Sequence, residues 1–246
     1  MILLILAFIY AIFCIKISIE GERRKIGFNI TYFISLFLTP IVSGLIILFF
    51  KKKNDAIITN DRSITPIVGG LIAMNFIIFV CEFFISTQLF NSMIVSLDTL
   101  SLNRLLTHQF IHASITHLKN NMATLLLFGP AIERRIKPIH FILFYLICGS
   151  IGGFSQIFIE NISDASIAGA SSSIFGLLGI FVGMKIKHKF GKINFPTFII
   201  PLCMIVQEVI ISLSHPKDKI GHIAHIGGAL TGIIIGFFYE RFTKTK

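Results

Sequence analysis

Long apolar runs separated by short polar segments dominate this chain. Six runs lie beyond residue 65, and each has about the length that an α-helix needs to cross a hydrocarbon core roughly 30 Å thick. They cover roughly 66–87, 112–130, 138–159, 169–185, 195–213 and 221–239. The segment 88–107 is polar and too long for a tight turn, so we expect a structured interfacial loop there. The pattern predicts a helical membrane protein.

Two more apolar runs precede these six. Residues 1–15 lack the charged start and the small-residue cleavage site of a signal peptide, so a short membrane helix is the better interpretation. Residues 28–50 predict a second span, which we expect Pro40 to kink. The predicted organisation is an N-terminal hydrophobic hairpin, a polar linker, a six-helix core and a basic cytoplasmic tail, over residues 1–53, 54–65, 66–240 and 241–246.

Composition and charge support a membrane protein. Hydrophobic residues make up 54% of the chain and charged residues only 14%, and the mean hydropathy is +0.84. The net charge of +10 comes from Lys and Arg that cluster in alternate connections between the spans, which is typical of cytoplasmic loops rather than of a nucleic-acid-binding surface. The predicted C-terminus is therefore cytoplasmic. The basic residues between 16 and 25 conflict with this pattern if residues 28–50 span the membrane.

The four cysteines all lie inside apolar runs and show no paired spacing. They are Cys14, Cys81, Cys148 and Cys203. We interpret them as small hydrophobic residues rather than as a disulfide framework or a metal site.

Candidate chemistry is concentrated in the segment 169–179, which places three serines and three glycines at the start of an apolar run. Each hydroxyl group in such a place needs a hydrogen-bond partner away from water. Ser171 also stands in a Gly-x-Ser setting with Gly169. On its own this match is equally compatible with small residues at a helix crossing.

The predicted topology places the N-terminal ends of the second, fourth and sixth core helices at one depth. Those ends carry His117 and Asn121, Ser171, and His225. Two stripes of small residues should let the fourth and sixth helices approach closely. The stripes are Ser172, Gly176, Gly179 and Gly183 on one helix, and His225, Gly228, Gly232 and Gly236 on the other.

That packing would bring His225 to the serines, where an imidazole can serve as a general base and then as a general acid. A structural histidine that caps a helix is the alternative. His117 and Asn121 lie four residues apart on one helical face and could donate to an oxyanion. Metal ligation by His108, His112 and His117 is a rival interpretation, but it lacks an H-E-x-x-H pattern.

No acidic residue lies near His225 in the sequence. Glu82, Glu160 and Glu208 lie in other segments, where each could pair, cap or reach the interface. We therefore expect a two-residue Ser171–His225 dyad rather than a triad.

Three motifs in this order resemble the rhomboid family of intramembrane serine proteases. They are His108-Gln-Phe-Ile-His-Ala-Ser-Ile-Thr-His-Leu-Lys-Asn-Asn121, then Gly169-Ala-Ser171, then Ala224-His-Ile-Gly-Gly228. The resemblance covers about residues 66–240. It implies an all-α membrane protein in which an N-terminal hydrophobic hairpin precedes a six-helix rhomboid-like transmembrane bundle.

The resemblance also implies roles for individual residues. Ser171 would be the nucleophile and His225 the base, while His117, Asn121 and the Ser171 amide would form the oxyanion hole. Gly169 and Phe175 would have supporting roles, with Phe175 packed on His225. Arg104 matches the arginine of the family's first loop, and Glu133 and Arg135 match a polar cluster after the second helix.

The chain departs from the family pattern at three places. Ser172 stands where the family usually has glycine, Asn103-Arg104 replaces a Trp-Arg pair, and His222 stands where a small polar residue is common. We expect Ser171→Ala to abolish cleavage, Ser172→Gly to retain activity and Ser173→Ala to be nearly silent.

The expected function is that of an intramembrane serine endopeptidase that cleaves transmembrane or juxtamembrane segments of membrane proteins. Its expected partners are transmembrane protein substrates and the lipid bilayer, with no cofactor, no metal and no nucleic acid. The expected location is a bacterial plasma (inner) membrane, with multiple passes. The alternative is a catalytically inactive rhomboid-like protein that binds membrane proteins; a transporter is a weaker third because no inverted repeat is evident.

Overall fold

The computed structural model describes residues 2–24, 31–32, 34–35, 40–48, 64–82, 84, 87–160, 167–186, 198–214 and 221–243. Regular structure in these residues is helical, and Val95 and Ile167 form an isolated antiparallel bridge rather than a strand pair. The predicted helical class is confirmed for this part of the chain. Contacts divide the chain into two compact units, 1–83 and 84–246.

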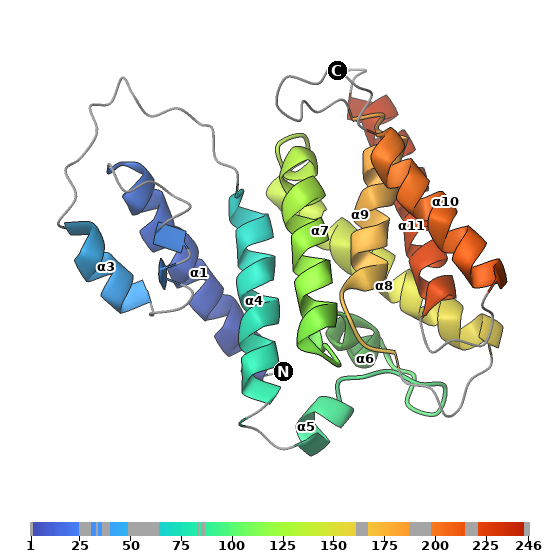
Figure 1. Ribbon diagram of the computed structural model, residues 1–246, viewed down its shortest axis with the longest axis horizontal. Coiled ribbons are helices and arrows are strands. Elements are labelled where there is room, and N and C mark those ends of the chain that lie inside the picture. Colours follow the sequence, from blue (N-terminus) through green and yellow to red (C-terminus); the bar gives the residue numbers. More distant parts are fainter. Residues whose placement is uncertain are drawn as a thin grey trace. The chain divides into compact units, whose positions relative to one another are not determined.

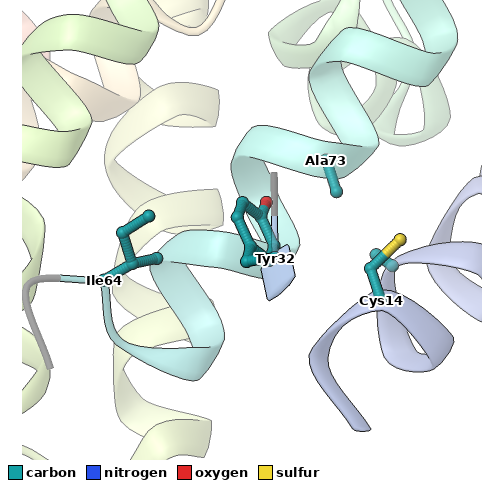
Figure 2. Close-up of a cluster of buried hydrophobic side chains, with 5 residues drawn as sticks. Cys14, Tyr32, Ile64 and Ala73 are labelled. Carbon is teal, nitrogen blue, oxygen red and sulfur yellow. The ribbon is translucent and has the colours of Figure 1, made fainter. Parts of the chain in front are cut away.

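The first unit contains α1 (Ile2–Glu22), α3 (Pro40–Leu48) and α4 (Pro66–Glu82), and α1 packs against the other two. A buried cluster joins α1 to α4, and in it Cys14, Tyr32, Ile64 and Ala73 lie close together (Figure 2). The Tyr32 hydroxyl donates to the Gly69 carbonyl of α4, which satisfies its buried polar group.

The N-terminal hairpin and the linker remain predictions. Residues 36–39 and 49–63 lie outside the described part of the chain, and with them the basic cluster Lys51–Lys53. Pro40 is the first residue of α3, so the predicted kink within a span over 28–50 is not tested. The division between the two units falls after residue 83, so α4 is described here with the first unit. The predicted segments 1–53, 54–65, 66–240 and 241–246 are not tested by this division.

The second unit is built around α9. Its elements are α5 (Thr87–Asn91), α6 (Leu102–Thr107), η2 (His108–Phe110), α7 (Ile115–Glu133), α8 (Pro138–Glu160), α9 (Ser171–Gly183), α10 (Ile199–Ser214) and α11 (His222–Thr243). Helix α9 packs against α7, α8, α10 and α11 (Figure 1). Most of its residues are buried, as expected of a helix that is apolar on all sides.

Small residues set the contact between α9 and α11. A Cβ atom at Gly232 would overlap the Gly176 carbonyl oxygen, and one at Gly228 would overlap the Ser172 carbonyl oxygen. A Cβ atom at Gly179 would overlap the Ala229 carbonyl oxygen in the same way. The two stripes predicted from the sequence therefore do face each other, and they bring the helix backbones together.

Two described helices are long and apolar enough to cross a membrane, at Pro138–Ile159 and His222–Thr243. Helices α4, α9 and α10 are apolar but shorter. The outward faces of the second unit are apolar, as expected of a surface that contacts lipid. Large exposed apolar residues include Ile147, Phe158, Ile210, Leu213, Ile234 and Phe242.

The predicted loop at 88–107 is structured. It contains α5 and α6, and the Arg104 guanidinium donates to the carbonyl oxygens of Asn91 at 2.8 Å and Ile94 at 2.7 Å. The bridge between Val95 and Ile167 then ties this loop to the segment that leads into α9. Arg104 thus helps to hold the approach to the serine cluster.

Candidate active site

Ser171 and His225 lie within hydrogen-bond distance of each other. Ser171 is the first residue of α9 and His225 the fourth of α11, and their Oγ and Nε2 atoms are 2.8 Å apart. The Phe175 ring stacks on the His225 ring, with centroids 4.6 Å apart and planes 5° from parallel. Phe175 comes one helical turn after Ser171, so α9 supplies both the hydroxyl group and the ring that supports its imidazole partner.

The two neighbouring serines bond elsewhere. The Ser172 hydroxyl donates to the Gly149 carbonyl of α8 at 3.3 Å, and the Ser173 hydroxyl donates to Gln109 Oε1 at 2.6 Å. Both side chains are buried. Among the described residues, Ser173 is the donor from which Gln109 Oε1 accepts, so we expect Ser173→Ala to lower stability although the nucleophile is retained.

Gly169 shapes the entry to α9. Its φ of +121° lies in the region that favours glycine, and a Cβ atom there would overlap the His117 ring. The Gly169 N–H donates to the His108 carbonyl at 2.8 Å. Ala170 then occupies the N-cap position and makes no side-chain cap, so this residue leaves the first N–H groups of α9 uncovered.

His117 and Asn121 lie at the start of α7. The Ser114 hydroxyl caps this helix by accepting the His117 N–H at 3.2 Å. The His117 ring lies against Gly169, two residues before Ser171. Asn121 is buried, and its amide Nδ2 is 3.0 Å from His112 Nε2.

His112 acts in this structure as the partner of Asn121. Burial favours the neutral form of the His112 imidazole. A neutral imidazole nitrogen can accept the Asn121 N–H. From the sequence His112 was a candidate metal ligand, and its spacing of nine residues from Asn121 gave no signal for this contact.

Glu208 contacts His225, although the dyad expected from the sequence did not include it. Its Oε1 atom lies 2.6 Å from His225 Nδ1 and 2.5 Å from His222 Nδ1. The side chains of Glu208 and His225 are each 12% exposed. The sequence left the partner of Glu208 open, and the packing of α10 on α11 brings its carboxylate to His225.

The same three residues offer a set of metal ligands. One ligand atom from each of Glu208, His222 and His225 lies within 4.8 Å of the others. Two histidines and a carboxylate are a known zinc-ligand combination. Among the described residues, this group and not His108 with His112 and His117 is the one brought together. All four cysteines are free, as predicted.

Comparisons with known proteins point to one family. The Rhomboid domain family model matches residues 99–242. RHOMBOID-like protein 4 of Arabidopsis thaliana is 35% identical over 54% of this chain and 33% of its own length. The putative rhomboid protease YdcA of Bacillus subtilis is 31% identical over 54% of this chain and 65% of its own.

The rhomboid protease GlpG of Haemophilus influenzae is 27% identical, and the match covers 58% of this chain and 72% of that protein. The chain spans a third of the Arabidopsis relative and just under two thirds of the Bacillus relative. The matched region begins within the 88–107 loop, ahead of Arg104, and contains every site residue described above. Since the Rhomboid domain covers more than half of the sequence, the chain belongs to the rhomboid family.

Proposed function

We propose that this chain is an intramembrane serine endopeptidase that cleaves transmembrane or juxtamembrane segments of other membrane proteins. The 2.8 Å contact between Ser171 Oγ and His225 Nε2 carries the proposal. A serine hydroxyl group is a weak nucleophile until a base accepts its proton, and a stacked imidazole at hydrogen-bond distance can do so. The names of the Bacillus and Haemophilus relatives, both rhomboid proteases, support a proteolytic role.

In the first step, His225 Nε2 accepts the Ser171 proton while Oγ attacks the carbonyl carbon of the scissile peptide bond. The carbonyl oxygen becomes an oxyanion. The resulting imidazolium then gives its proton to the departing amine, and an acyl-enzyme with a Ser171 ester remains. A water molecule, deprotonated by His225, hydrolyses that ester and restores the serine.

The oxyanion would be stabilised at the junction of α7 and α9. The N–H groups at the start of α9 have no capping side chain, and the positive end of the helix dipole adds to their effect. His117 lies beside this turn, and Asn121 has two amide protons, of which one is directed to His112. In this proposal His117 and Asn121 donate to the oxyanion.

The short length of α9 supports cleavage inside the membrane. Its 13 residues span about 20 Å, which is less than the roughly 30 Å thickness of the hydrocarbon core. If the end of α9 near Gly183 lies at one membrane–water interface, Ser171 lies within the hydrocarbon core, below the opposite membrane–water interface. The proposal also includes the predicted fold, topology and location of the protein. These are a six-helix bundle over 66–240, several membrane passes and a bacterial plasma membrane with a cytoplasmic C-terminus.

A substrate must present a peptide carbonyl that is not held in a helix. A regular transmembrane helix directs each carbonyl to an N–H four residues on, so the nucleophile cannot reach the carbonyl carbon without local unwinding. Substrates of this site would therefore have helix-weakening residues near the cut and small residues beside it.

The proposal is tested by reconstituting the full chain in liposomes with a panel of single-span reporter proteins that carry Gly- and Ala-rich segments. We expect cleavage of a reporter by the wild type, and none by Ser171→Ala or His225→Ala. Leu213→Ala, which changes an exposed apolar residue of α10, should cleave at the wild-type rate. If neither the wild type nor any variant cleaves the reporters but the chain still binds them, the inactive, client-binding alternative is favoured. The name of the Arabidopsis relative, which specifies no protease activity, is compatible with that alternative.

A further inference from the structure

Glu208 is an acidic residue within the apolar helix α10, and its side chain points to His225, the general base of the proposed protease. Helix α10 exposes Val206, Val209, Ile210 and Leu213, as expected of a lipid-facing helix. Glu208 lies among them in the sequence, yet its side chain is only 12% exposed, and its carboxylate contacts α11. Ionisable groups in such helices are costly unless they are paired and are by default functional.

The hydrogen bonds of Glu208 determine which nitrogen of His225 carries the proton. An ionised carboxylate can only accept hydrogen bonds, so His225 Nδ1, at 2.6 Å, must be the donor. A neutral imidazole carries one proton, and its Nε2 is then left with a lone pair. That lone pair faces Ser171 Oγ at 2.8 Å, which is the arrangement a general base requires.

We infer that Glu208 is a positioning residue that completes a Ser171–His225–Glu208 triad. This inference rests on the proposed protease function and extends it beyond the two-residue dyad. Glu208 holds the His225 ring in the tautomer and orientation that receive the serine proton. It also offsets the positive charge that His225 gains when Ser171 attacks the substrate.

His222 supports the carboxylate from the same helix. Its Nδ1 atom lies 2.5 Å from the same Oε1 atom, and its ring is perpendicular to that of His225 with centroids 6.2 Å apart. The titratable groups that face His225 are thus His222 on α11, Glu208 on α10 and His117 on α7, which interacts with it electrostatically. Of these three, Glu208 is the one that carries a negative charge.

The test uses the full chain in detergent micelles and a fluorophosphonate probe, which labels an activated serine without any knowledge of the substrate. Saturation with probe separates the maximal labelling rate from the probe concentration that gives half of it. We expect Glu208→Ala and Glu208→Gln to lower the maximal rate by between roughly 10²- and 10⁴-fold while the half-saturating concentration changes little. Glu208→Asp, which retains the charge with a shorter reach, should recover part of the rate.

Two further variants separate positioning from packing. Gln207→Ala changes the exposed neighbour of Glu208 on α10 and should label like the wild type. His222→Gln leaves the contact between Glu208 and His225 in place and should lose less than Glu208→Gln. An equal loss in His222→Gln would place the effect in the packing of the cluster and contradict the inference.

The outcome for Glu208 is distinguishable from the outcome for the protease itself. Wild-type labelling that Ser171→Ala does not remove would contradict the proposed function, whatever Glu208 does. Labelling of Ser171 at the full maximal rate in Glu208→Gln would contradict only the triad. If a chelator slows the wild type but not Glu208→Gln, the three groups hold a metal, and the positioning role is wrong.

Thermal melting of each variant shows whether it is folded. If both Glu208→Ala and Glu208→Gln melt below the assay temperature, the wild type with ¹⁵N-labelled histidine decides instead. The His225 signal, assigned by its loss in His225→Gln, should show the proton on Nδ1. A proton on Nε2 would overturn the inference.

Discussion

At the scale of single residues, three adjacent serines have three different partners. Ser171 contacts His225, Ser172 contacts α8, and Ser173 contacts Gln109. The Gly-x-Ser pattern and the position of Phe175 favoured Ser171 from the sequence alone. The partners of Ser172 and Ser173 could not be predicted, because they lie on segments that only the tertiary fold brings near.

Ser173→Ala should retain the nucleophile but lower stability. It leaves the Gln109 Oε1 atom buried without the Ser173 hydroxyl group as its donor, which costs about 1–3 kcal/mol. Ser172→Gly removes a weaker contact and restores the residue usual in the family. We expect both variants to label with a serine-directed probe, and only Ser173→Ala to show a clearly lower melting temperature. A Ser173→Ala protein that melts like the wild type would mean that this hydrogen bond contributes little.

Replacement of the proposed oxyanion donors should mainly lower kcat. Asn121→Ala and His117→Ala each remove one donor, which costs roughly 10²-fold in kcat. Asn120→Ala is the matched control, because Asn120 is the exposed neighbour of Asn121 on α7. Cleavage kinetics on a reporter substrate and melting curves separate the two effects. A loss of stability as large as the loss of rate would assign Asn121 to structure, through its bond to His112.

At the scale of elements, the contact between α9 and α11 positions the candidate site. The glycine stripes predicted this contact from the spacing of small residues, and both stripes lie where they were expected. The contact of Glu208 could not be predicted in the same way, because a single charged residue in an apolar run forms no repeating pattern that would assign it to a helix contact. Only the packing of α10 on α11 shows where its carboxylate lies.

Gly232→Ala should therefore destabilise the protein. Its Cβ atom would overlap the Gly176 carbonyl oxygen and force α9 and α11 apart, which costs about 1–3 kcal/mol and moves His225 from Ser171. Gly221→Ala makes the same substitution where the nearest atom would be 3.5 Å away, an ordinary contact. Melting and probe labelling of the pair check this. Equal behaviour of the two variants would contradict the close packing.

At the scale of the whole molecule, the helical class followed from the length of the apolar runs. The limits of the helices were less well predicted. Helix α9 is shorter than the run 169–185 that contains it, and α10 begins after the start of the run 195–213 and ends one residue beyond it. Apolar composition continues into loop segments and therefore cannot mark where a helix ends. The division of the chain after residue 83 also had no signal in the sequence, because the polar linker lies earlier, at 54–65.

Membrane orientation is the prediction that belongs to this scale. The alternation of Lys and Arg predicts that a reporter fused after Lys246 is cytoplasmic and that a tag between residues 160 and 164 is external. Both positions adjoin or lie within segments outside the described residues. Protease protection of the two tags in intact cells measures this. An external C-terminus would place Ser171 near the opposite leaflet and contradict the proposed topology.

The identity of the nucleophile is most directly tested by mass spectrometry of the wild-type chain after reaction with a fluorophosphonate. We predict a single adduct on Ser171, because it alone among the three serines contacts an imidazole. His225→Ala should react far more slowly, and Ser172→Gly should carry the adduct on the same residue. An adduct on Ser172 or Ser173, or the absence of any adduct in a folded wild-type protein, would contradict the account of this site.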